Sequence, residues 1–216
     1  MKKNVKVLCI NTAHNHAQIS FYENGKIFKC TLEANAKSSE NVLPAIEEVL
    51  LKAQTKICDI DVFGVVVGPG SFTGLRVGVS LIKGFCAVNT KAKVCAVSSL
   101  ELMAQEFKKC SSEKHFCTVQ NALGGRFFVK TYQETAVTEE LLTRSLPNCF
   151  KVGLESENLP EMNDYVSPSV QTLTDFCVQQ INAKNFVLPQ NLTPVYLRLS
   201  QAEENLLKKE DCDAED

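Results

Sequence analysis

The segment 68–88 contains the residues whose types and spacing come closest to a chemical site. An apolar, strand-like run over residues 61–67 ends in Gly68-Pro69-Gly70-Ser71, and a helical pattern with Thr73 in its first turn follows. At such a junction, backbone N–H groups and the helix dipole favour an anion. We therefore predict Gly68, Gly70, Ser71 and Thr73 as candidate contacts to a phosphate or another anion. The alternative is a tight turn whose serine only caps the helix.

The well-known catalytic versions of a glycine-rich turn do not fit this segment. A Walker A loop requires Gly-Lys followed by Ser or Thr, and that sequence is missing after these glycines. Ser71 lies outside a Gly-x-Ser-x-Gly pattern, and no His or Asp is placed to activate it. We therefore expect no catalytic residue here.

Other side chains could also bind a ligand. His14 and His16 are two residues apart and could contribute to a metal site. No third ligand is evident in the sequence, so we expect no metal site. Arg76 lies in the narrow polar strip of an otherwise apolar helix. It could bind a partner carboxylate or a phosphate, and the alternative is a simple solvent-facing arginine.

The composition is that of a globular protein. The 216 residues are 44% hydrophobic and 22% charged, with a formal net charge of −2. No apolar run approaches the roughly 20 residues of a membrane-spanning helix, so we expect no membrane contact. A nucleic-acid binder that works alone is usually strongly basic, and this chain is not. Ten cysteines without a Cys-x-x-Cys pair, and the lack of a signal peptide, favour reduced thiols in a cytoplasmic protein.

The first half of the chain alternates between strand-like and helix-like patterns. Asn24-Gly25 between two apolar runs is a strong hairpin signal. Pro44 conflicts with a helix that begins at Glu40, so that helix is distorted in its first turn or begins later. We predict strands at residues 5–12, 16–22, 26–32, 61–67 and 93–97, and helices at 39–54, 72–88 and 98–107. This order is typical of a mixed sheet covered by helices, as in a ribonuclease-H-like half-domain.

The second half gives weaker signals. We predict strands at residues 115–120 and 126–132, a short helix at 138–144, a loop-rich stretch at 145–168, a helix at 169–182 and a final apolar run at 195–199. A boundary near residue 109 divides the chain into an N-terminal lobe at 1–109, which binds a partner, and a smaller, degenerate lobe at 110–202. Residues 203–216 form an acidic tail with seven acids and two lysines.

Two helices of the first lobe are more apolar than one buried face requires. The helix at 72–88 is apolar nearly all round, and the helix at 39–54 is apolar over more than one face. The excess indicates a second cover, either a partner protein or the second lobe. We predict these partner-interface residues: Val42, Leu43, Ile46, Val49, Leu50, Phe72, Leu75, Arg76, Val79, Ile82 and Lys83.

The sequence from Gly68 to Gly78, Gly-Pro-Gly-Ser-Phe-Thr-Gly-Leu-Arg-Val-Gly, resembles the signature of the bacterial TsaB (YeaZ) family. Shorter matches occur in the family's order at residues 10–13, 39–44, 97–100 and 194–198. The resemblance implies an α/β fold of two ribonuclease-H-like, actin-like lobes, with mixed sheets flanked by helices.

The resemblance also implies a role in making N6-threonylcarbamoyladenosine in tRNA. The chain would be a non-catalytic scaffold that pairs through its two apolar helices with a TsaD-type catalytic subunit. A TsaE-type ATPase would join them, and tRNA would be held by the complex. ATP and metal would lie on the partner subunits, with no cofactor on this chain. The same helices could also pair two copies of it.

Four positions depart from the pattern of the family or of its catalytic relatives. Asn11 and Asn121 stand where the family usually has Asp, and Asn is a poorer ligand for a hard cation. Ser38 and Val42 stand where the catalytic relatives place a His-x-x-x-His metal pair. These departures favour a subunit that is not itself an enzyme. The alternative hypothesis is an enzyme acting on its own, either an actin-like ATPase or a metal-dependent acyltransferase or peptidase-like protein.

Overall fold

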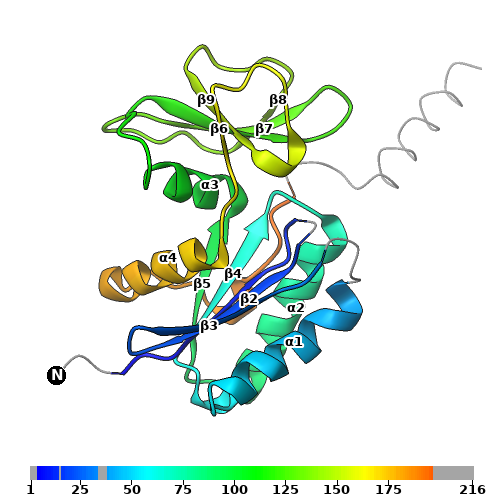
Figure 1. The fold of residues 1–216 in the computed structure, drawn as a ribbon, viewed down its shortest axis with the longest axis vertical. Helices are drawn as coiled ribbons and strands as arrows, with labels where there is room; N and C mark the ends of the chain where they lie inside the picture. Colours follow the sequence, from blue (N-terminus) through cyan, green and yellow to red (C-terminus); the bar gives the residue numbers. More distant parts are fainter. Residues whose placement is uncertain (1–3, 15, 34–37, 197–216) are drawn as a thin grey trace, which may run out of the picture.

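The computed structural model describes residues 4–14, 16–33 and 38–196, and these form two five-stranded mixed sheets (Figure 1). In the first sheet the order is β3-β2-β1-β4-β5. Its strands are β1 (Val7–Asn11), β2 (Gln18–Glu23), β3 (Lys26–Thr31), β4 (Val62–Gly68) and β5 (Lys93–Ser98). β1, β2 and β3 are antiparallel neighbours, whereas β4 runs parallel to both β1 and β5. The predicted meander is confirmed, and Asn24 and Gly25 both have positive φ in its second turn.

Helices cover both faces of the first sheet. On one face lie α1 (Ser38–Lys52) and α2 (Phe72–Val88), which pack against each other and against a core that includes Leu8, Ile10 and Phe63. On the other face lies α4 (Val170–Ala183), which packs on Val7, Cys9 and neighbouring side chains. Alternate residues of β1 therefore feed opposite cores, as the two-residue period of a strand requires.

The second sheet repeats the first. Its order, β8-β7-β6-β9-β10, matches β3-β2-β1-β4-β5 position by position, with the same parallel and antiparallel pairings. Its strands are β6 (Phe116–Asn121), β7 (Phe127–Tyr132), β8 (Leu141–Thr143), β9 (Phe150–Leu154) and β10 (Asp164–Val166). Between β8 and β10, the described chain has no counterpart of α1 or α2; the connections are loops and the 3-10 turn η2 (Glu155–Glu157). The second lobe is thus smaller and degenerate, as predicted.

The two lobes exchange a helix. α3 (Ser99–Phe107) follows the first sheet but packs mainly on β6 and β7 of the second. α4 follows the second sheet but packs on β1, β2 and β4 of the first. Residues 187–195 also return to the first sheet, where Val187 N donates to Val94 O and Val195 N donates to Val67 O. The boundary at residue 109 therefore separates the strands of the two sheets, while the segment 170–195 belongs with the first lobe.

Two further expectations need correction. The predicted helix at 138–144 is wrong, because residues 141–143 pair with β7 as the edge strand β8. The predicted loop at 145–168 contains β9 and β10.

Helix α1 begins at Ser38 and includes Pro44, so the helix does not start later. The 3-10 turns η1 (Ile57–Asp59) and η3 (Pro189–Asn191) complete the described elements. The acidic tail at 203–216 lies outside the described residues.

Candidate functional site

The glycine turn between β4 and α2 packs tightly against the turn that follows β1. A Cβ at Gly70 would lie 2.4 Å from Ala13 O, and a Cβ at Gly68 would lie 2.7 Å from Val195 O. Ser71 N donates to Ala13 O, and Ser71 Oγ accepts from Gly74 N as the cap of α2. These contacts account for both glycines and for Ser71 without a ligand. An anion at Gly68, Gly70, Ser71 and Thr73 therefore stays a prediction.

Close packing against the end of β1 also explains the two glycines Gly74 and Gly78 of α2. Thr12 Oγ1 donates to Gly74 O, and a Cβ at Gly74 would lie 2.0 Å from Thr12 O. A Cβ at Gly78 would lie 2.5 Å from Thr12 Oγ1. The stripe formed by Gly74 and Gly78 thus lets the end of β1 approach the helix axis.

An interlobe pocket of about 350 Å³ opens beside this junction. It lies where the carboxyl ends of β1, β6 and β9 face one another, which is the usual position of ligand sites in open α/β sheets. Its walls come from the turn after β1, the start of α2, the ends of β6 and β9, and η2. The lining residues are Ala13, His14, Gly70, Ser71, Gln120, Asn121, Leu123, Phe128, Leu154, Ser156 and Glu157.

The polar side chains of the interlobe pocket centre on Gln120. Its Nε2 lies 3.3 Å from His14 Nδ1, and its side chain also hydrogen-bonds Glu157. Glu157 Oε2 accepts from Asn121 N at 2.6 Å. Burial lowers the pKa of His14 to about 4, so the imidazole is neutral at physiological pH. Burial raises the pKa of Glu157 to about 7, against the opposing effect of its bonds from Asn121 and Gln120.

Asn11 and Asn121 play equivalent parts at the ends of β1 and β6. Asn11 Oδ1 accepts from Ala13 N at 3.1 Å, and Asn121 Oδ1 accepts from Leu123 N at 2.8 Å. Each amide thus stabilises the turn of its own hairpin. His16, in the turn before β2, has Nδ1 3.2 Å from Leu32 O, whereas His14 faces Gln120, so the two histidines do not face a common point. Within residues 4–14, 16–33 and 38–196, no group of three or more His, Cys, Asp or Glu could hold a metal ion.

Seven of the predicted interface residues are buried in the chain's own core and do not lie on its surface. Their side chains pack on the first sheet or between α1 and α2, so the sheet supplies the cover that the apolar pattern required. The buried residues are Val42, Ile46, Val49, Leu50, Leu75, Val79 and Ile82.

The outer surface of α1 and α2 carries the remaining predicted residues. Leu43, Arg76 and Lys83 are exposed, and Phe72 is half-buried. The structure adds two apolar side chains that we did not select, Leu51, which is 79% exposed, and Val88, which is 73% exposed. Their positions opposite the buried stripe could have been found by assigning one face of each helix to the sheet.

Arg76 is held by aromatic side chains. Its guanidinium lies 3.9 Å from the centre of the Phe72 ring, and its Nε donates to Tyr196 OH at 3.0 Å. The rings of Phe72 and Tyr196 are 4.7 Å apart. Arg76 is therefore positioned by the returning chain at 194–196. This contact favours neither binding to a partner carboxylate or phosphate nor a simple solvent-facing arginine.

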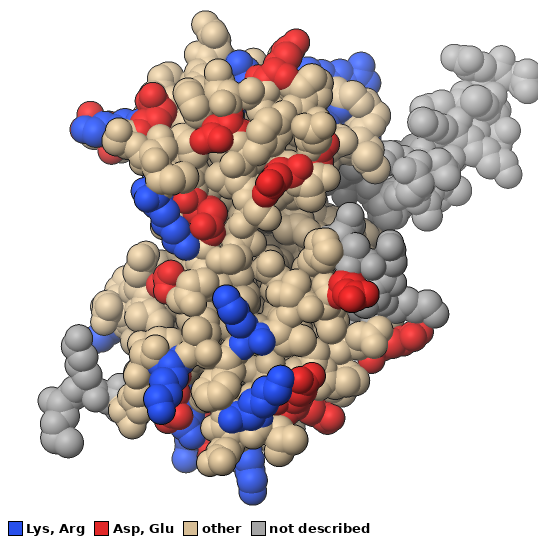
Figure 2. Space-filling model, in the orientation of Figure 1, with Lys and Arg blue, Asp and Glu red and all other residues tan. Residues whose placement is uncertain are grey.

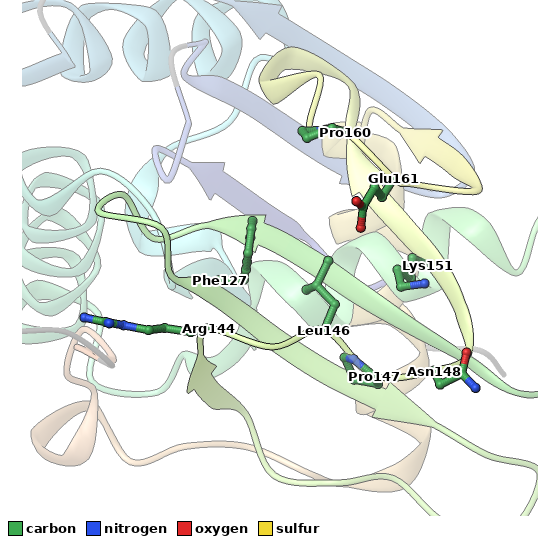
Figure 3. Close-up of a pocket in the computed structure, with 8 residues that line it drawn as sticks. All are labelled: Phe127, Arg144, Leu146, Pro147, Asn148, Lys151, Pro160 and Glu161. Carbon is green, nitrogen blue, oxygen red and sulfur yellow. The ribbon is translucent and has the colours of Figure 1, made fainter.

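A second pocket, of about 390 Å³, lies on the outer face of the second sheet (Figure 3). Phe127 and Leu146 form its apolar part, and Arg144, Lys151 and Glu161 supply charges. It occupies the sheet face opposite α3, which loops cover in place of two helices. Its charges are of both signs, so it does not indicate a particular ligand.

Comparisons with known proteins agree with the fold described above. The family profile described as "TsaD: tRNA N6-adenosine threonylcarbamoyltransferase" matches residues 32–163, which is more than half of the chain. The Escherichia coli protein named "tRNA threonylcarbamoyladenosine biosynthesis protein TsaB" is 21% identical over 232 residues, covering 95% of this chain and 100% of that protein. The chain belongs to the TsaB/YeaZ family, whose members share a TsaD-like domain.

Other members of the TsaB/YeaZ family are similarly distant in sequence. A protein of the same name from Buchnera aphidicola (Schizaphis graminum) is 24% identical over 126 residues, which span 58% of this chain and 60% of that relative. The solved structure titled "YeaZ from Pseudomonas aeruginosa" has a TM-score of 0.75 at 18% identity and covers 89% of this chain and all of that one. This likeness confirms the two-lobed actin-like fold.

Proposed function

We propose that this chain is a non-catalytic subunit in the synthesis of N6-threonylcarbamoyladenosine in tRNA, and that it pairs with a TsaD-type catalytic subunit. The TsaB relatives are named for this biosynthesis. A match named "tRNA N6-adenosine threonylcarbamoyltransferase" is 32% identical over 96 residues, so the two kinds of protein share sequence. Related lobes can pair through equivalent helices.

The outer surface of α1 and α2 is the observation that carries the pairing. The two helices lie side by side on one face of the first sheet (Figure 1). Leu51 and Val88, near the C-terminal ends of α1 and α2, and Leu43, in the first half of α1, are exposed although they are large and apolar. Side chains of this kind gain free energy when a partner covers them, at about 25 cal/mol per Å² of apolar surface. The same surface would pair two copies of the chain when the catalytic subunit is absent.

The surface charge favours binding of tRNA by the assembled complex and not by this chain alone. On the face shown in Figure 2, Lys and Arg alternate with Asp and Glu over both lobes. With a net charge of −2, the chain offers little of the phosphate attraction on which tRNA binding depends. tRNA would therefore be held mainly by the assembled complex, with a TsaE-type ATPase as a further partner.

The two asparagines that stand where the family usually has aspartate support a subunit without its own active site. Asn11 and Asn121 use their side-chain oxygens to cap the turns of their own hairpins. A hard cation prefers carboxylate oxygens, which neither amide supplies. ATP and metal ions would accordingly act on the partner subunits.

The pairing is tested by charge substitutions on the proposed surface. Leu51→Asp and Val88→Asp place a charge where an apolar contact is proposed, and each should weaken binding to the TsaD-type subunit of the same organism by at least about tenfold. Binding is measured by titration calorimetry with both purified proteins. Both residues are exposed, so far-ultraviolet circular dichroism of the free chain should not change.

A matched control comes from the second lobe. Leu141 on β8 is 56% exposed, and Leu141→Asp makes the same chemical change away from α1 and α2. Its binding should equal that of the unmodified chain. Full affinity in both Leu51→Asp and Val88→Asp would show that the partner does not contact this surface.

A further inference from the structure

We propose that the interlobe pocket binds a small, uncharged molecule through an amide-type edge, in which a carbonyl oxygen and an N–H group lie side by side. Primary carboxamides and nucleobases such as uracil share this edge. The proposal concerns the free chain and does not depend on its pairing with another subunit. It rests on two buried polar atoms that lack a partner, on the charge of the walls and on the size of the pocket.

The first unpartnered atom belongs to His14. Gln120 Nε2 can only donate, so His14 Nδ1 accepts from it at 3.3 Å. The neutral imidazole then carries its proton on Nε2. This Nε2 is buried and has no hydrogen-bond partner among the described residues. His14 thus offers a donor at the pocket wall.

The second unpartnered atom belongs to Gln120. Only 3% of this residue is exposed, and its Oε1 has no partner in the described part of the chain. Leaving a buried polar group without a hydrogen bond costs about 1–3 kcal/mol. A ligand that satisfies both atoms would remove two such costs. His14 Nε2 requires an acceptor and Gln120 Oε1 requires a donor, which is the pairing that an amide edge provides.

The walls of the pocket select against an anion. No Lys or Arg occurs among the described residues that line it, and Glu157 is its one carboxyl group. A phosphate placed here would meet this carboxylate and no cation. Ala13, Leu123, Phe128 and Leu154 supply apolar surface for the remainder of a ligand. A volume of about 350 Å³ accommodates a single six-membered ring with its substituents and some water.

The test compares two probes that differ only at the proposed edge. Nicotinamide carries an amide edge, and nicotinate carries a carboxylate on the same ring. Titrations of the full chain are followed by backbone amide chemical shifts. We expect saturable shifts around residues 120–123 and 154–157 with a dissociation constant near 1 mM, which is typical of so small a ligand. Nicotinate should bind at least about tenfold more weakly. Uracil, tested in parallel, distinguishes a nucleobase from a carboxamide.

Variants connect the binding to the two atoms. Gln120→Leu removes the acceptor and His14→Phe removes the donor, and each should weaken binding at least about tenfold. Gln133→Leu on the exposed surface is the matched control and should leave it unchanged. One variant lies in the turn after β1 and the other on β6, so the conclusion does not depend on a single variant that fails to fold. The proposal is wrong if neither nicotinamide nor uracil saturates, if nicotinate binds as tightly, or if binding survives both Gln120→Leu and His14→Phe. Binding of Mg–ATP at these same resonances would also overturn it.

Discussion

At the scale of single residues, the glycines of α2 show how one close contact constrains a sequence. Gly74 has Thr12 O within 2.0 Å of its would-be Cβ, and this atom belongs to the backbone, which cannot simply rotate away. Gly84 lies on the same helix, and nothing lies within 4 Å of its would-be Cβ. The same substitution should therefore have opposite effects at the two positions.

Gly74→Ala should lower the free energy of unfolding by about 2–3 kcal/mol, because β1 must move away from α2. Gly84→Ala should raise it by about 0.5–1 kcal/mol, because alanine has the higher helix propensity and meets no neighbour. Urea denaturation of both variants measures the two changes. Equal effects would mean that Thr12 does not approach the helix as described.

His14 and Glu157 make opposite contributions to the pH dependence of stability. His14 is half-buried as a residue, but its Nε2 is buried, and its pKa is lowered to about 4. As the pH falls from about 6.5 to 4, the unfolded chain takes up a proton here that the folded chain does not, and stability is lost. The pKa of Glu157 is raised to about 7. As the pH falls from about 7 to 4.5, the folded chain protonates first, and stability is gained.

These two effects should largely cancel between about pH 4.5 and 6.5. Glu157→Gln removes the gain and leaves the loss from His14. We therefore expect the variant to lose about 1–2 kcal/mol more than the unmodified chain between pH 7 and pH 5, after allowance for solvent screening. Urea denaturation at pH 5, 6 and 7 measures the difference. Parallel pH curves for the two proteins would contradict the raised pKa of Glu157.

At the scale of elements, the sequence predicted what local chemistry determines. The hairpin at Asn24-Gly25, the helix after the glycine turn and the Ser98 cap, whose Oγ accepts from Glu101 N, all follow from short-range rules. β8 was missed because a three-residue edge strand has too few positions to show a period. It forms because β7 offers a free edge, and the residues it pairs with lie outside its local sequence.

The candidate sites were harder to predict than the elements. The apolar pattern of α1 and α2 predicted a second cover for both helices, but it could not say which side chains face the sheet and which face outward. The structure assigns Leu75 and Ile82 to the core and leaves Leu51 and Val88 outside. The interlobe pocket was missed because His14, Gln120 and Glu157 are far apart in sequence and meet only when the two sheets face each other. The equivalent positions of Asn11 and Asn121 were its one sequence signal.

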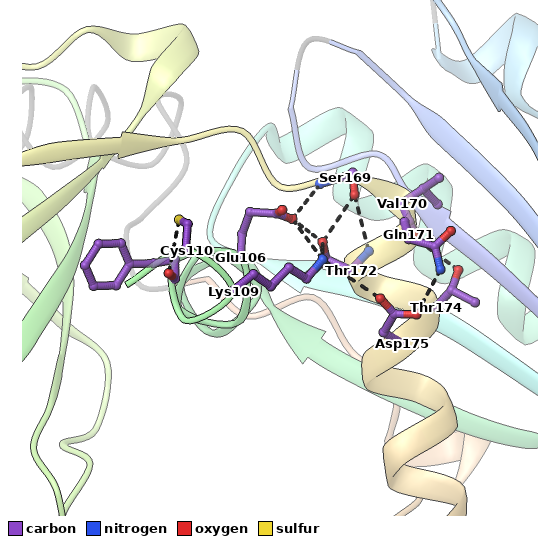
Figure 4. A network of polar contacts seen from close by, with 10 residues as sticks. Glu106, Lys109, Cys110, Ser169, Val170, Gln171, Thr172, Thr174 and Asp175 are labelled. Carbon is purple, nitrogen blue, oxygen red and sulfur yellow. Dashed lines mark hydrogen bonds and ion pairs between the residues drawn. The ribbon is translucent and has the colours of Figure 1, made fainter. Parts of the chain in front are cut away.

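At the scale of the whole molecule, the exchange of helices joins the lobes into one folding unit. Polar contacts link α3 to α4 (Figure 4): Glu106 accepts from Ser169 N and from Thr172 Oγ1, and Lys109 Nζ donates to Thr172 Oγ1 at 2.6 Å. Behind them, α4 covers Val7 and Cys9 of β1. The second sheet is covered by α3, which follows the first sheet in the chain, and the first sheet is covered by α4, which follows the second. Neither lobe should therefore fold without its neighbour.

A chain that ends at residue 167 tests this dependence. It retains every strand of both sheets but lacks α4 and the returning segment 187–195, so the face of the first sheet that contains Val7, Cys9 and Val66 would be exposed to water. We expect it to lack a cooperative thermal transition, since large buried side chains such as Leu173 each contribute about 2–4 kcal/mol to a total of about 5–15. A chain that ends at residue 196 keeps every contact described here and is the control, with a single transition expected by far-ultraviolet circular dichroism. A cooperative transition in the shorter chain would instead mean that residues 1–167 specify the first lobe and that α4 and the returning segment only add to its stability.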